Sequence, residues 1–196
     1  MTQTFTLHLD DNCALRHHLS TLTSALPTEK RHKLAKMKHL DDAVRSAAAS
    51  VLVRMLITQH TELSNNAIIL HTERYGKPFL PGDHGLYFNA SHSGGWVAVS
   101  FGRCNNGIDV QQIRKIRGVY PPDAYFEKWV QHEARLKCLG VGILGKISQD
   151  IPLFVRCFHP DKYTKLAVCA TQEGFAAPKT VPPKALLAFA STAKFP

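Results

Sequence analysis

Hydrophobic residues recur at steps of three and four along two stretches of the chain, a spacing that places them on one face of an α-helix. In the first stretch the recurring positions are Leu40, Val44, Ala47, Val51 and Met55. A short basic segment that begins at Thr28 precedes it, so we expect a short helix followed by a longer one. The second stretch starts after Pro121-Pro122 and stops at Gly140. The pattern therefore predicts a long helix on either side of the middle of the chain.

Short runs rich in β-branched and aromatic residues, bounded by glycine and polar residues, predict strands. They cover residues 4–9, 65–70, 96–101, 107–113, 151–158 and 163–170, and we expect the last two to form a hairpin. The order of helices and strands is similar on both sides of the central segment, residues 88–114. This order suggests an α+β fold, pseudo-duplicated into two similar halves, residues 1–102 and 103–196.

Polar side chains stand in the central strands where apolar residues would be expected. Asp109 interrupts an otherwise apolar strand and shares one strand face with Gln111, because successive side chains alternate in facing. A buried carboxylate is costly unless it is paired or holds a metal. His92 lies between two serines just past the preceding strand. The alternatives without chemistry are a hydrogen-bonded polar pair for Asp109 and Gln111, and a histidine satisfied by its neighbouring serines.

The second predicted helix carries Trp129, Glu133 and Lys137 at four-residue steps, hence on one face. Taken alone, this spacing is more typical of a solvated ion pair between Glu133 and Lys137 than of a catalytic pair.

Charge narrows the choice of partner. The 196 residues include 24 lysines and arginines against 15 acids, a formal charge of +9, which favours a polyanionic partner: nucleic acid, a phosphorylated cofactor or an acidic protein. The basic residues between positions 30 and 38 lack interleaved aromatic residues, and neither a nucleic-acid motif nor a glycine-rich phosphate loop occurs. Five cysteines without a CxxC pair, and no apolar leader or membrane span, predict a reducing, cytoplasmic setting.

Several motifs occur in a fixed order along the chain. They are LPTEKRHK at 26–33, DAVRS at 42–46 with VLVR at 51–54, YGKP at 75–78, FNASHSG at 88–94, GIDV at 107–110, WVQHEARLK at 129–137 and KLAVCA at 165–170. In this order they resemble the 4′-phosphopantetheinyl transferases of the larger, monomeric kind that activate peptide and polyketide synthetases. The resemblance covers most of the chain except its tail.

The resemblance implies an enzyme that transfers the 4′-phosphopantetheine group of coenzyme A to a serine of an apo carrier protein and releases adenosine 3′,5′-bisphosphate. The partner would be an acidic acyl or peptidyl carrier protein of fatty-acid, polyketide or nonribosomal peptide biosynthesis, with no nucleic acid and no membrane involved, and the enzyme a monomer. The active site would lie in the cleft between the two halves, with the 3′-phosphate and adenine of coenzyme A on the N-terminal half and the metal and the catalytic groups on the C-terminal half.

The same resemblance assigns individual residues. Mg²⁺ would be bound by Asp109, Gln111 and Glu133, and the catalytic residues would be Glu133, Lys137 and His92, with Glu133 taking the proton of the carrier serine. Coenzyme A would be bound by a basic and polar set: Lys30, Lys33, Arg45, Ser46, Lys77, Ser91, His92 and Lys137.

Three departures from the family pattern keep other functions open. His132 stands where the family usually has a lysine before the catalytic glutamate, so its charge would depend on pH. Gln111 stands where the family usually has a second acid, so we expect weaker metal binding there. Only 24 residues lead from Asp109 to Glu133, whereas relatives have about one more helix and loop, and we expect this to change carrier choice more than coenzyme A binding. The first alternative is an inactive paralogue that only binds coenzyme A or carrier protein. The second is a basic nucleic-acid-binding protein.

Overall fold

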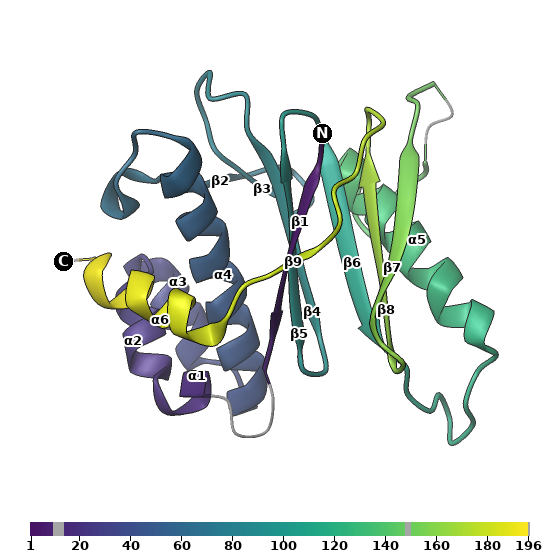
Figure 1. Cartoon of the computed structure of the whole chain (residues 1–196), viewed down its shortest axis with the longest axis horizontal. Coiled ribbons are helices and arrows are strands. Elements are labelled where there is room, and N and C mark those ends of the chain that lie inside the picture. Colours follow the sequence, from purple (N-terminus) through teal and green to yellow (C-terminus); the bar gives the residue numbers. More distant parts are fainter. Residues whose placement is uncertain (10–13, 148–149, 196) are drawn as a thin grey trace.

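Two sheets stand side by side between outer layers of helices in the computed structural model, which describes residues 1–9, 14–147 and 150–195 (Figure 1). In chain order the elements are β1 (Gln3–His8), α1 (Ala14–His17), α2 (Leu19–Ser24), α3 (Thr28–Ala35), α4 (Leu40–His60), the 3₁₀ turn η1 (Asn65–Ala67), β2 (His71–Thr72), β3 (Pro78–Phe79), β4 (Tyr87–Ser93), β5 (Trp96–Gly102), β6 (Asn106–Gln112), α5 (Asp123–Leu139), β7 (Phe154–Asp161), β8 (Thr164–Ala170), β9 (Lys179–Thr180) and α6 (Pro183–Thr192). Within these ranges, no helix combines the length and apolar character needed to cross a bilayer.

The first sheet and α4 form the larger hydrophobic core. The strand order is β4-β5-β1-β9, and β5 pairs antiparallel with both β4 and β1. The periodic pattern predicts one apolar face for α4, but most of its residues from Ala43 to Ile57 are buried. The reason is that β4 and β5 cover one side of the helix while α1, α2, α3 and α6 cover the other. A helix that is apolar nearly all round is a core helix rather than a surface one.

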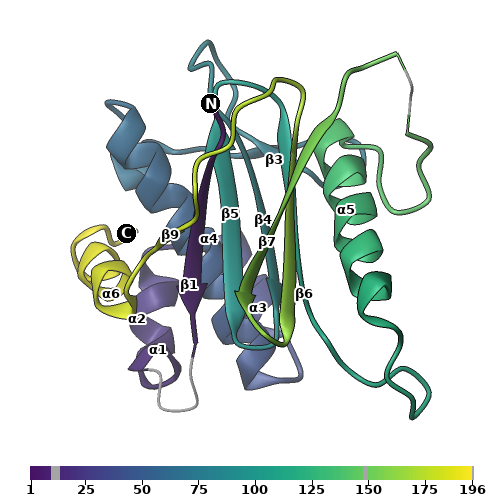
Figure 2. The ribbon, with the colours of Figure 1, turned by 45° about the vertical axis from the view of Figure 1, so that its right-hand side comes forward.

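The second half repeats the topology of the first. Its sheet has the order β6-β8-β7, and α5 packs on β6 and β8 (Figure 2). In each half a strand is followed by a long helix and then by two strands, and the last strand is the central one: β5 in the first sheet, β8 in the second. The predicted α+β fold of two similar halves is confirmed.

The packing of α5 on its sheet depends on Gly107. A Cβ atom at this position would lie 2.2 Å from the backbone nitrogen of Cys138 and 2.3 Å from the carbonyl oxygen of Ala134, distances that real Cβ atoms do not show. Glycine therefore lets the backbone of α5 rest directly on β6. The helix ends at Gly140, which has φ 67° and donates its backbone N–H to the carbonyl of Leu136, as predicted from the stop at this glycine.

The end of the chain returns to the first half. β9 pairs parallel with β1, and α6 packs on α2 and α4 with Leu186 and Ala190 fully buried. The sequence carries little signal here because the apolar run of α6 is short and is preceded by several prolines. The division of the chain at residue 102 remains a prediction. Residues 179–192, although they follow it in sequence, lie against the N-terminal half.

The strand predicted for residues 65–70 is wrong. Asn65–Ala67 forms a 3₁₀ turn around the buried side chain of Arg54, whose Nε donates to Asn65 Oδ1 at 2.7 Å and whose Nη2 donates to the carbonyl of Ile68 at 2.9 Å. Burial lowers the pKa of Arg54 to about 10, because dehydration penalises the charged form. The segment turns to bring its oxygens to the guanidinium, a requirement that the local β propensity of residues 67–70 does not reveal.

Candidate functional site

The two sheets meet along β4 and β6, where side chains take the place of a backbone ladder. Alternate residues of β4 accept backbone N–H groups from alternate residues of β6. The pairs are Asn89 with Ile108 (3.1 Å), Ser91 with Val110 (3.3 Å) and Ser93 with Gln112 (3.1 Å). We call this set of bonds the β4–β6 seam. It fixes the register between the two halves, so that Asp109 of β6 faces Ser91 of β4.

Asp109 lies at the centre of a compact polar cluster. Its Oδ1 accepts a hydrogen bond from Lys137 Nζ at 2.6 Å and another from Ser91 Oγ at 2.9 Å. Its side chain is only 8% exposed, whereas that of Lys137 is 30% exposed. The cost of burying the carboxylate is thus offset by a charged partner and a hydroxyl. Among the described residues Asp109 is not hydrogen-bonded to Gln111, and Lys137 forms its ion pair with Asp109 instead of Glu133. The polar pair of Asp109 with Gln111 and the solvated pair of Glu133 with Lys137 are therefore excluded.

Glu133 enters the same cluster from α5, one helical turn before Lys137. Its Oε1 is buried and has no hydrogen-bond partner among the residues that the structure describes. A buried acceptor without a partner costs about 1–3 kcal/mol, so such an atom in a cluster of polar groups points to a ligand. Glu133, Lys137, Asp109 and Gln111 line a cavity of about 360 Å³ together with Trp129. Lys137 and Glu133 also line a neighbouring cavity of about 290 Å³, whose other side is formed by residues 75–78.

The oxygen atoms of this cavity fit a hard divalent cation. Two carboxylates, Asp109 and Glu133, and the amide of Gln111 border it, and carboxylate and amide oxygens are the ligands that Mg²⁺ accepts. Gln111 Nε2 donates to the carbonyl of Gln112 at 3.1 Å, which leaves the amide oxygen available. In the described ranges no group of three or more His, Cys, Asp and Glu side chains forms a metal site, so any metal here relies on the amide as its third protein ligand.

A basic group lies beside the same cavity, at the ends of α3 and α4 and the turn after β4. Lys30 Nζ donates to Ser46 Oγ at 3.0 Å, and Arg45 Nη1 donates to the carbonyl of Gly94 at 3.0 Å. Partial dehydration of the His92 ring, and next the charge of Arg45, lower the pKa of His92. Dehydration, followed by the charge of Lys33, likewise lowers the pKa of Lys30. Dehydration is the larger cause for both groups, and an anion bound beside Lys30, Arg45 and His92 would favour their charged forms.

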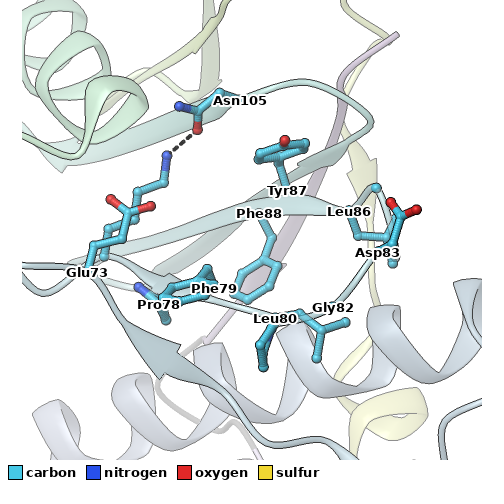
Figure 3. Close-up of a pocket in the computed structure, with 13 residues that line it drawn as sticks. Glu73, Pro78, Phe79, Leu80, Gly82, Asp83, Leu86, Tyr87, Phe88 and Asn105 are labelled. Atoms are coloured by element: carbon cyan, nitrogen blue, oxygen red, sulfur yellow. Dashed lines mark hydrogen bonds between the residues drawn. The ribbon is translucent and has the colours of Figure 1, made fainter.

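Two residues predicted to bind coenzyme A are placed differently from the rest. Lys33 forms an exposed ion pair with Glu29 at 2.7 Å on the outer surface of α3. Lys77 is buried, and its Nζ donates to Asn105 Oδ1 at 2.6 Å, drawn as the dashed line in Figure 3, and to the carbonyls of Asn106 at 3.1 Å and Cys138 at 2.9 Å. An ammonium has three donors, so all are used within the protein. Burial lowers the pKa of Lys77.

Lys77 also borders the cavity of about 350 Å³ shown in Figure 3. The other predicted site residues all lie in the described part of the chain, and none of them lines this cavity. Lys77 thus joins the start of β6 to the end of α5.

The motifs agree with the sequences of known proteins. A family model described as "4′-phosphopantetheinyl transferase, N-terminal" matches residues 14–102. Over 190 residues the chain is 27% identical to the 4′-phosphopantetheinyl transferase Sfp of Bacillus subtilis, covering 78% of this chain and 85% of the relative. It is 28% identical over 206 residues to the 4′-phosphopantetheinyl transferase psf-1 of Bacillus pumilus, covering 86% and 88% of the two chains. The chain is therefore similar to 4′-phosphopantetheinyl transferases over most of its length.

The resemblance predicted from the motifs and the expectation of an enzyme are therefore confirmed. What the motifs of a phosphopantetheinyl transferase do not reveal is how β4 contributes. Asn89 and Ser93 are part of the seam, and the alternation of polar residues in the motif FNASHSG was the available signal. Asn105, which accepts from Lys77, has no comparable signal, because its partner lies 28 residues away in sequence.

Proposed function

We propose that this chain transfers the 4′-phosphopantetheine group of coenzyme A to a serine of an apo carrier protein, depends on Mg²⁺ and releases adenosine 3′,5′-bisphosphate. The observation that carries the proposal is the buried, unpartnered Oε1 of Glu133 beside the Asp109–Lys137 pair, in a cavity that a basic group adjoins. We further propose a cytoplasmic enzyme that acts as a single chain.

Recognition of coenzyme A follows from the basic group. Lys30, Arg45 and His92 come from three elements and would hold the 3′-phosphate, with the hydroxyl of Ser46 orienting Lys30. Phosphate binding would raise the lowered pKa of His92, because the protonated ring then gains an anionic partner. Lys33 lies on the outer surface of α3, where it is 68% exposed and paired with Glu29, so we assign it no direct contact with the phosphate.

The transfer itself needs one proton acceptor and stabilisation of the departing phosphate. Glu133 takes the proton from the serine hydroxyl, whose oxygen bonds to the phosphorus that carries pantetheine. The bond between that phosphorus and the bridging oxygen breaks, and its electron pair leaves with adenosine 3′,5′-bisphosphate. Lys137, one helical turn from Glu133, donates to phosphate oxygens, and Ser91 keeps Asp109 oriented through its 2.9 Å hydrogen bond. When bound by Asp109, Gln111 and Glu133, Mg²⁺ would neutralise charge on the pyrophosphate.

The shortened segment between β6 and α5 supports an acidic carrier partner. It forms a tight turn in which the backbones of Ile116 and Val119 bond to each other in both directions, at 2.8 and 3.1 Å. Arg114, Lys115 and Arg117 lie in or beside this turn, next to the exposed side chains of Val119 and Tyr120. A basic and apolar surface close to the catalytic helix suits an acidic domain that presents a serine.

The test is intact-mass spectrometry of apo acyl and apo peptidyl carrier proteins incubated with this protein, coenzyme A and Mg²⁺. We expect a gain of one phosphopantetheine unit that EDTA prevents. Glu133→Gln should abolish the gain while coenzyme A still binds, and Glu127→Gln, the same change on the same helix outside the cavity, should not. Binding of coenzyme A without any transfer to several carriers would refute the proposal and identify a protein that only binds its ligand.

A further inference from the structure

Lys137 and the proposed metal both require the carboxylate of Asp109. Asp109 Oδ1 accepts from Lys137 Nζ at 2.6 Å, a short, charge-assisted bond in which the carboxylate is almost fully buried. Mg²⁺ binds carboxylate oxygens at about 2.0–2.1 Å. An ammonium and a divalent cation bound to one small carboxylate would repel each other strongly in a site with little water to screen them. The two cations are therefore antagonists at Asp109.

The side chain of Lys137 can also occupy a second cavity. Its side chain and that of Glu133 line both neighbouring cavities, the one that contains Asp109 and the one bordered by residues 75–78. With four rotatable carbon–carbon bonds and 30% exposure, the side chain can leave Asp109 without moving α5. Phosphate oxygens of a nucleotide in the second cavity would give the ammonium a new acceptor.

We propose that Lys137 and the divalent cation exchange at Asp109, so that Lys137 couples metal binding to the binding of coenzyme A. The proposal rests on the magnesium site of the proposed function. The metal displaces the ammonium from Asp109, and the freed ammonium binds the phosphates. Metal binding frees Lys137 for the phosphates, and phosphate binding draws Lys137 away from Asp109. Each ligand thereby favours binding of the other, which is positive cooperativity.

Two other arrangements predict different effects of removing Lys137. If Lys137 is a permanent anchor of α5 on β6, its loss loosens the cluster and weakens metal binding. If the metal binds the other oxygen of Asp109 and leaves Lys137 in place, its loss leaves the coupling to coenzyme A unchanged.

The experiment measures Mn²⁺ binding directly, from the electron paramagnetic resonance signal of the free ion, with and without coenzyme A. Without coenzyme A, we expect Lys137→Met to bind Mn²⁺ about 5- to 150-fold more tightly than the natural chain, the range of a typical coupling between two sites. Lys128→Met is the matched control: it removes the same charge from the exposed face of α5, about 13 Å further along the axis, and should change the affinity less than twofold. Asp109→Asn should lose most of the binding.

Coenzyme A should tighten Mn²⁺ binding more in the natural chain than in Lys137→Met. Lys137→Gln, which keeps a polar end, and urea unfolding of each variant separate loss of folding from loss of coupling. Unchanged or weaker Mn²⁺ binding by both folded Lys137 variants would overturn the exchange alone, as would an undiminished effect of coenzyme A. No Mn²⁺ binding by any of the proteins would instead overturn the metal assignment of the proposed function, and the exchange with it.

Discussion

The close contact of α5 with β6 makes Gly107→Ala the most informative substitution in this chain. The added Cβ would lie 2.2 Å from a backbone nitrogen and 2.3 Å from a backbone oxygen of α5, whereas ordinary contact begins at 3.4 Å. Backbone atoms of a helix cannot rotate away as a side chain can. The helix must therefore move from β6 by about 1 Å, and Glu133 and Lys137 move with it.

This movement has two expected costs. Forced overpacking of a core contact destabilises by about 1–3 kcal/mol, and we expect the upper part of that range because the neighbours are backbone atoms. Misplacement of catalytic groups by about 1 Å reduces the rate about 100-fold. Urea unfolding measures the first, and the rate of carrier modification by intact mass measures the second.

Gly174→Ala provides the control for these measurements. Gly174 has φ 114° and its nearest neighbours are 3.8 Å or more from an added Cβ, so alanine is strained there without displacing anything. We expect a loss of stability of about 1–2 kcal/mol with an unchanged transfer rate. If Gly107→Ala stays within about 0.5 kcal/mol of the natural chain, the size of an ordinary surface change, and transfers at the same rate, the packing argument is refuted.

Three further substitutions test the basic residues. Lys77→Met leaves three oxygens without their donor and should lower the free energy of unfolding by about 1–3 kcal/mol in urea; unchanged stability would show that the ammonium is free for a ligand. Lys30→Ala should weaken binding of coenzyme A in calorimetry but leave dephospho-coenzyme A unaffected, and equal losses would contradict a 3′-phosphate site. Because dehydration and Arg45 lower the pKa of His92, the ring is mainly neutral at pH 7, and coenzyme A binding should tighten as the pH falls from about 7.5 to about 5.5. His92→Ala should flatten that dependence; a parallel slope would exclude the ring as its origin.

Local patterns predicted the parts of this fold that are held together locally. The steps of three and four in α4 and α5, the glycine after α5, and the hairpin of β7 and β8 all follow from neighbours in sequence. The partial exception is α4, whose burial on nearly all sides depends on α6, more than 100 residues away. Periodicity reports which residues are apolar, but not how many elements will pack around them.

In the candidate site, too, local patterns predict some residues and miss those that depend on distant contacts. Alternation along β6 places Asp109 and Gln111 on one face, and both line the cavity that Glu133 enters. Lys77 could not be placed by the same reasoning, since YGKP reads as an exposed basic loop. Its ammonium is buried because carbonyls 29 and 61 residues away converge on it. A residue that binds distant backbone atoms has no sequence signal until the fold brings those atoms together.

The return of β9 and α6 to the first half bears on how such chains can be recombined. A single crossover near residue 102 would join one parent's β1 edge and α2–α4 surface to another parent's β9 and α6, which were shaped for different neighbours. Two crossovers, one before β6 and one between β8 and β9, would instead move residues 106–170 as a cassette and leave the first core with its own last helix. Chimeric libraries of this fold should exchange the sheet of β6, β7 and β8 together with α5 as an insert rather than as a tail.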